Sequence, residues 1–155
     1  MNQLNIEPLH DDVGARVSGT ALSGDLSAAV VALIVDAIDT YSVVCFADQD
    51  MTDDKQLAFT RRLGEPEAEH VTFGSTGEVK YFGTVGNVGD DGAKHGNADS
   101  ATHYQTGNHL WHSDSSFREP PSYVSILPAH AVPGQDGPTQ FLRIPAGLPR
   151  LAHPL

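Results

Sequence analysis

The most informative segment of this sequence is Gly107-Asn108-His109-Leu110-Trp111-His112-Ser113-Asp114-Ser115-Ser116-Phe117. At its centre, His112 and Asp114 stand two positions apart. In an extended segment, side chains two positions apart point to the same face. An imidazole and a carboxylate on one face supply two of the three ligands of a 2-His-1-carboxylate triad, which holds non-heme Fe(II) with open coordination positions. A bare His-x-Asp is common by chance, so its specificity comes from the neighbouring Trp111, Phe117 and Asn108.

Length and charge restrict what surrounds this segment. A chain of 155 residues with 39% hydrophobic residues is long enough for one domain with a core of its own. Its formal net charge of −11 argues against nucleic acid and against anionic membrane surfaces as partners. A small-molecule substrate remains compatible with this charge, because a local basic pocket can exist in an acidic protein.

Cysteine usage and the terminal sequence bear on the compartment. Cys45 is the one cysteine, which excludes an internal disulfide and a cysteine-based zinc site, and its apolar surroundings predict a buried thiol. The first twelve residues lack the basic and apolar regions of a secretory signal. The longest apolar run, residues 28–35, is too short to span a bilayer. We therefore expect a soluble, cytoplasmic protein.

Hydrophobic periodicity and capping residues predict two helices among short strands. Ser27 is the expected N-cap of a helix to about residue 41, and Thr52 begins a second helix that Gly64 ends. Alternating or continuous apolar residues predict strands at 4–9, 13–17, 43–47 and 122–127, the first two paired as a hairpin. Residues 86–105 have the composition of a long loop. The pattern favours an α+β protein built on a jelly roll.

At residues 107–117 the chain resembles the Fe(II)/2-oxoglutarate-dependent dioxygenases of the taurine dioxygenase and 2,4-dichlorophenoxyacetate dioxygenase (TauD/TfdA) family, with the closer similarity to the dichlorophenoxyacetate branch. Weaker similarities lie at 9–19, 41–49, 59–64 and 137–141. The resemblance implies a double-stranded β-helix of the clavaminate synthase-like type, with the N-terminal helices packed on the sheet. Residues 4–141 would form the N-terminal part of such a domain.

The resemblance also implies roles for individual residues. His112 and Asp114 would ligate Fe(II), and Thr139 would hydrogen-bond the distal carboxylate of 2-oxoglutarate. Asn108 and, in a looser alignment, His70 would contact the substrate. The implied reaction uses O2 and couples oxidative decarboxylation of 2-oxoglutarate to hydroxylation of a small organic acid, of the aryloxyalkanoate or sulfonate class.

The sequence departs from the family pattern in two ways. Asp136 stands where the family usually has a glycine. The distal histidine ligand and the arginine that pairs with 2-oxoglutarate are absent at family spacing, and residues 142–155 form an atypical tail that contains no acidic residue. We therefore expect a truncated jelly roll, with a frameshift after Phe141 as one hypothesis, and with reduced stability or homo-oligomer formation as a consequence of unpaired strand edges.

Alternatives remain for the chain and for its residues. The protein could be a non-catalytic truncated paralogue. The segment Gly107-Asn108-His109 also occurs in metallophosphoesterases, but no Asp-x-His is present to complete that signature. Asn108 is as compatible with a turn as with a substrate contact. For His70, a surface position is favoured over a substrate contact. Arg118 is the nearest cation in sequence for a substrate anion.

Overall fold

The computed structural model describes residues 4–68, 85–86, 93–94, 96, 106–132, 134 and 139–144. The chain divides into two compact units, one containing residues 1–65 and 128–155, the other residues 66–127. His70 and Asp136 lie outside the described residues.

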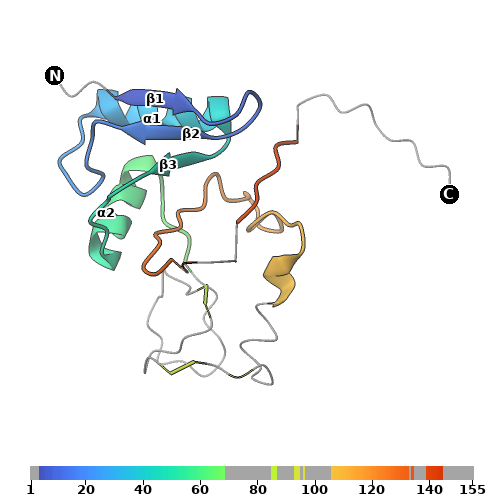
Figure 1. Ribbon diagram of the computed structural model, residues 1–155. Helices are drawn as coiled ribbons and strands as arrows, with labels where there is room; N and C mark the ends of the chain where they lie inside the picture. The colour runs from blue at the N-terminus through green and yellow to red at the C-terminus, as the bar shows by residue number, and fades with distance from the viewer. Residues whose placement is uncertain are drawn as a thin grey trace. The chain divides into compact units, whose positions relative to one another are not determined.

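The first unit contains a three-stranded sheet in the order β1-β2-β3 (Figure 1). Strand β1 (Asn5–Pro8) pairs antiparallel with β2 (Ala15–Ser18), which confirms the predicted hairpin. Strand β3 (Val44–Phe46) pairs parallel with β2. A parallel pair requires a crossover connection, and the helix between β2 and β3 supplies it.

That crossover is helix α1 (Ala28–Tyr41), which begins where the sequence predicts. The Ser27 hydroxyl accepts a hydrogen bond from the Val30 N–H at 3.3 Å, so Ser27 is the N-cap. Ile34, Ala37 and Ile38 form its buried stripe. Leu33, which directly precedes Ile34, is 46% exposed, so it lies outside this buried stripe.

The sheet buries only one of its faces. Ala15 and Val17 on β2 are buried, whereas Arg16 between them is exposed. Cys45 pairs with Arg16 in the parallel register and is exposed with it, so the predicted buried thiol is wrong. The physical reason is alternation, because the two residues share the uncovered face of the sheet.

Helix α2 (Asp53–Leu63) also has the predicted limits. The Thr52 hydroxyl accepts from the Lys55 N–H, and the Gly64 N–H donates to the Thr60 carbonyl. Its buried residues are Gln56 and Phe59. Asp53 and Asp54 lie in the first turn, where their negative charges interact favourably with the positive end of the helix dipole. This interaction stabilises the N-terminus of the helix.

The described part of the second unit is mostly irregular. Among its described residues, the one helix or strand is the short 3-10 helix η1 (Thr106–His109). Residues 122–127 alternate between exposed and partly buried, but they belong to no strand, so that predicted strand is absent. A strand is defined by a ladder of backbone hydrogen bonds to a neighbouring strand, and none of the described strands pairs with residues 122–127. No helix in the described ranges is long and apolar enough to cross a membrane.

Candidate metal centre

His112 and Asp114 lie together in the second unit. Helix η1 closes with a hydrogen bond from the Leu110 N–H to the Gly107 carbonyl at 3.1 Å, and the chain then runs irregularly over residues 111–113 into a turn. The Nε2 atom of His112 is 3.3 Å from the Oδ1 atom of Asp114. Residues 112–114 belong to no strand, yet the two side chains lie on the same side of the segment, and both are about half exposed.

The other ring nitrogen of His112 has a backbone partner. Nδ1 lies 2.8 Å from the carbonyl oxygen of Leu110. A carbonyl oxygen can only accept, so Nδ1 carries the hydrogen. In the neutral ring the lone pair is then on Nε2, the atom that faces Asp114. Metal-ligating histidines have this arrangement, in which the second N–H is given to a carbonyl or carboxylate.

The separation of the two donor atoms fits a divalent metal ion. Two adjacent ligands of an octahedral ion, each bound at about 2.1 Å, lie about 3 Å apart, close to the observed distance. A lone pair and a carboxylate oxygen at this distance repel each other unless a cation or a proton lies between them. The donor set is therefore suited to Fe(II). Within the described ranges, no group of three metal-binding side chains occurs.

The structure does not test the predicted roles of the other site residues. Thr139 is exposed and belongs to the first unit, so its role toward 2-oxoglutarate stays a prediction. Asn108 lies within η1, and His70 falls outside the described residues. The predicted substrate contacts of Asn108 and His70 likewise stay predictions.

Arg118 has a partner within the protein. Its Nε atom lies 2.5 Å from Glu67 Oε1, and its guanidinium carbon lies 5.7 Å from the centroid of the Phe117 ring. Glu67 also accepts hydrogen bonds from the hydroxyls of Ser115 and Ser122. Sequence reasoning missed Glu67, because an isolated glutamate 48 residues from Ser115 carries no local signal.

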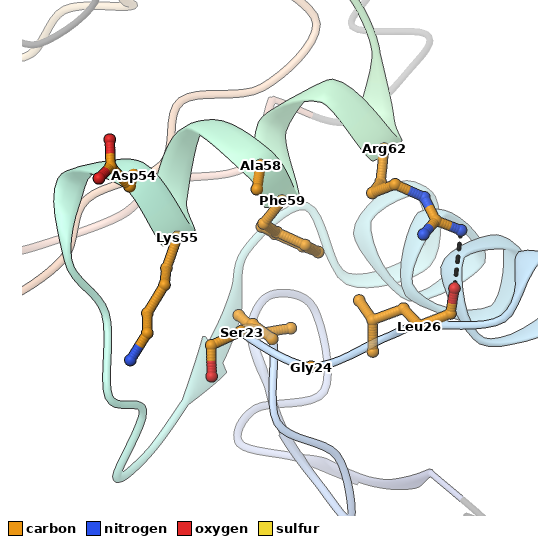
Figure 2. Close-up of a pocket in the computed structure, with 9 residues that line it drawn as sticks. Ser23, Gly24, Leu26, Asp54, Lys55, Ala58, Phe59 and Arg62 are labelled. Atoms are coloured by element: carbon orange, nitrogen blue, oxygen red, sulfur yellow. Dashed lines mark hydrogen bonds between the residues drawn. The ribbon is translucent and has the colours of Figure 1, made fainter.

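A cavity of about 290 Å³ lies in the first unit, between helix α2 and the loop before α1 (Figure 2). Phe59 and Leu26 form part of its apolar wall, and Lys55 and Arg62 lie along its rim. Arg62 donates to the Leu26 carbonyl at 2.7 Å, which joins α2 to that loop. None of the predicted site residues lines this cavity.

Residues 5–142 match the model of the family described as taurine catabolism dioxygenase TauD, TfdA family. The chain belongs to this family. The family uses Fe(II), 2-oxoglutarate and O2, so the expected cofactors agree with it. The match also decides against the metallophosphoesterase alternative.

Two TauD/TfdA relatives illustrate the similarity. The α-ketoglutarate-dependent 2,4-dichlorophenoxyacetate dioxygenase of Burkholderia sp. (strain RASC) is 34% identical over 142 residues, which are 89% of this chain and 48% of that protein. The α-ketoglutarate-dependent sulfate ester dioxygenase of Pseudomonas putida is 32% identical over 154 residues, 99% of this chain and 46% of that protein. The chain thus spans about half the length of these relatives.

A solved structure gives the same assignment. The crystal structure of AAD-2 in complex with Mn(II) and N-oxalylglycine aligns with a TM-score of 0.64 and 32% identity. The alignment covers 77% of this chain and 39% of that one. A divalent metal is therefore present in a structural relative of this TauD/TfdA chain.

Proposed function

We propose that this chain supplies two protein ligands, His112 and Asp114, to the Fe(II) site of a 2-oxoglutarate-dependent dioxygenase. The observation that carries the proposal is the His112–Asp114 pair, with donor atoms 3.3 Å apart and with the second histidine nitrogen held by Leu110. The chain would contribute this pair as the N-terminal part of a double-stranded β-helix.

Each residue has a distinct task in this proposal. The Leu110 carbonyl holds the Nδ1 proton of His112 and so keeps the Nε2 lone pair available. Asp114 offers a negative charge that offsets part of the charge of the divalent ion. Thr139 would donate its hydroxyl to a carboxylate of 2-oxoglutarate. When bound, the iron and 2-oxoglutarate supply the oxidising chemistry with O2, and the protein orients the substrate and restricts access of water.

The substrate we propose is a small organic anion. The relatives named above act, by their names, on 2,4-dichlorophenoxyacetate and on sulfate esters. A third relative, from Sphingobium herbicidovorans, is an (S)-phenoxypropionate/α-ketoglutarate-dioxygenase and is 30% identical over 139 residues. An aryloxyalkanoate, a sulfonate or a sulfate ester fits this range.

Anaerobic titration with Fe(II) and 2-oxoglutarate tests the proposal. We expect a visible charge-transfer absorption that is lost in His112→Ala and in Asp114→Ala. His109→Ala is the matched control, because it removes an exposed histidine of the same segment and should leave the band intact. Absence of the band in the unchanged chain would favour the non-catalytic paralogue and overturn the proposal.

The substrate class is tested in the same sample. A substrate that binds beside the metal perturbs the charge-transfer band. We expect a shift on addition of 2,4-dichlorophenoxyacetate or of an alkyl sulfate, and succinate on admission of O2. A band that responds to neither anion would contradict the proposed substrate class while leaving the metal site in place.

A further inference from the structure

Three side chains converge on the carboxylate of Glu67 in the second unit. The Ser115 hydroxyl donates to Oε1 at 2.9 Å, and Arg118 Nε lies 2.5 Å from the same oxygen. The Ser122 hydroxyl donates to the other oxygen, Oε2. We call Glu67, Ser115, Arg118 and Ser122 the Glu67 cluster. Glu67 follows helix α2 closely in the sequence. Through the Glu67 cluster it contacts the segment that carries the metal pair.

The cluster holds both ends of one turn. The Arg118 N–H donates to the Ser115 carbonyl at 3.2 Å, which closes a four-residue turn directly after Asp114. Ser115 and Arg118, the first and last residues of this turn, both contact Glu67 Oε1. Rotation of the turn about its own axis would break one of these contacts. Glu67 therefore fixes the direction in which the chain leaves Asp114.

The backbone at Ser115 needs such support. Its φ of 49° lies in the left-handed region, which serine seldom adopts. A non-glycine residue keeps this conformation only where its surroundings enforce it, because it costs on the order of 1–3 kcal/mol. Two hydrogen bonds hold Ser115 in this conformation: its hydroxyl donates to Glu67, and its carbonyl accepts from the Arg118 N–H.

We propose that Glu67 is a positioning residue for the metal pair. By holding the turn from Ser115 to Arg118, its carboxylate keeps Asp114 beside His112 and keeps the His112 ring on the Leu110 carbonyl. This inference rests on the proposed function and deepens it, because it names what preorganises the ligands. Glu67 itself acts only through these neighbours and does not ligate the metal.

The competing explanation is that Glu67 and Arg118 form an ordinary surface ion pair that has no effect on His112 and Asp114. An exposed pair contributes about 0–1 kcal/mol and orders little. Three features distinguish the Glu67 cluster from such a pair. Both carboxylate oxygens are used, the Glu67 and Arg118 side chains are 34% and 25% exposed, and the contact closes a loop of 48 residues.

The first arm of the test needs no metal. In a 15N-histidine-labelled chain, the ring nitrogen shifts report which nitrogen of His112 carries the hydrogen, and His112→Gln assigns the signal. For the neutral ring we expect the Nδ1–H form in the unchanged chain, because Nδ1 lies 2.8 Å from the Leu110 carbonyl oxygen. Glu67→Ala should shift His112 toward the Nε2–H form that free histidine prefers, and Glu67→Gln, which keeps an acceptor for Ser115, should shift it less.

The second arm measures Co(II) affinity by the visible absorption of the ion. We expect Glu67→Ala to weaken binding by about tenfold, the lower end of the effect seen when support for a metal ligand is removed. Ser115→Ala should act in the same direction, and the double variant should lose little more than Glu67→Ala alone. Glu119→Ala is the matched control, since it removes an exposed carboxylate one residue after Arg118.

The outcomes separate the two proposals. If Glu67→Ala changes neither the His112 tautomer nor the Co(II) affinity, the positioning role is refuted, whatever happens to stability. If the unchanged chain binds no Co(II) but its tautomer still responds to Glu67→Ala, the metal site fails while the positioning of His112 stands. A loss of stability without a change at His112 would make Glu67 a purely structural contact and would overturn the inference. Should Glu67→Ala unfold the chain, Ser115→Ala and Glu67→Gln carry both readouts.

Discussion

Leu110 and His112 are joined by a contact of 2.8 Å between the carbonyl oxygen of the first and the Nδ1 atom of the second. The two residues are only two positions apart, so this contact forms within the segment itself. It selects the ring nitrogen that is free to face Asp114, and it does so before any metal arrives. The contact that selects the tautomer is thus formed inside residues 110–114, and the proposed role of Glu67 is to support that segment from outside it.

Trp111 lies between these two residues and gives a fluorescence signal for them. It is the single tryptophan of the chain, and 68% of its surface is exposed. We expect an emission maximum typical of a hydrated indole, and quenching when Co(II) binds to the adjacent His112. His112→Gln should abolish the quenching and leave the emission maximum unchanged. A maximum at short wavelength that depends on protein concentration would contradict the exposed position and would indicate self-association.

The regular elements could be predicted because their signals are local. Ser27 and Thr52 each cap their own helix through a residue three positions on, and Gly64 ends α2. Such contacts need no knowledge of the rest of the fold. Cys45 was predicted wrongly because its exposure depends on which face of the sheet is covered, a property that its neighbours in sequence do not encode.

The candidate site shows the same division. The sequence placed His112 and Asp114 on one side, and the 3.3 Å separation agrees, although the segment is not a strand. Glu67 escaped prediction because its partners are 48 and 55 residues away. Closing so long a loop depends on tertiary packing, which no periodicity or capping pattern records.

Helix α1 offers a direct test of the packing. Ile34 is fully buried, whereas its neighbour Leu33 is 46% exposed. We expect Ile34→Ala to lower the free energy of unfolding by about 2–5 kcal/mol, because it removes buried methyl groups and leaves a cavity. Leu33→Ala should cost well under 1 kcal/mol, on the order of other surface substitutions. Urea unfolding followed by circular dichroism measures both, and equal effects would show that the buried face of α1 is misplaced.

Gln49 joins two loops of the first unit through both ends of its amide. Its Oε1 accepts from the Leu22 N–H at 2.8 Å, and its Nε2 donates to the carbonyls of Ala47 at 3.0 Å and Thr20 at 3.5 Å. Gln49→Ala leaves the Leu22 N–H unpaired, which should cost about 1–3 kcal/mol. It should also accelerate hydrogen exchange at Leu22.

The change Gln49→Glu separates the accepting role from the donating role. A glutamate retains an oxygen for Leu22 but directs its second carboxylate oxygen at the carbonyls of Ala47 and Thr20. We therefore expect Gln49→Glu to be destabilised relative to the unchanged chain, even though exchange at Leu22 stays slow. Stability equal to that of the unchanged chain would show that the two donated bonds contribute nothing.

Arg143 tests whether the start of residues 142–155, predicted from sequence to be an atypical tail, belongs to the folded part of the first unit. Its Nη1 donates to the Thr40 carbonyl at 3.1 Å and to the Asp12 carbonyl at 3.3 Å. Helix α1 has no basic residue in its last turn, so Arg143 brings the positive charge that the C-terminal end of the helix dipole favours. These exposed bonds should contribute on the order of 1 kcal/mol.

We expect Arg143→Ala to lower the urea midpoint by a corresponding amount. Arg143→Lys should recover part of the loss, because a lysine keeps the charge but lacks the planar fork of donors. Arg16→Ala is the control for charge: it also removes an exposed arginine from a chain of net charge −11, without touching the end of α1. If Arg143→Ala and Arg16→Ala unfold at the same midpoint, Arg143 does not cap the helix. A lower midpoint for Arg143→Ala alone would show that residue 143 stabilises the end of α1 across about a hundred intervening residues, as the 103-residue separation from Thr40 requires.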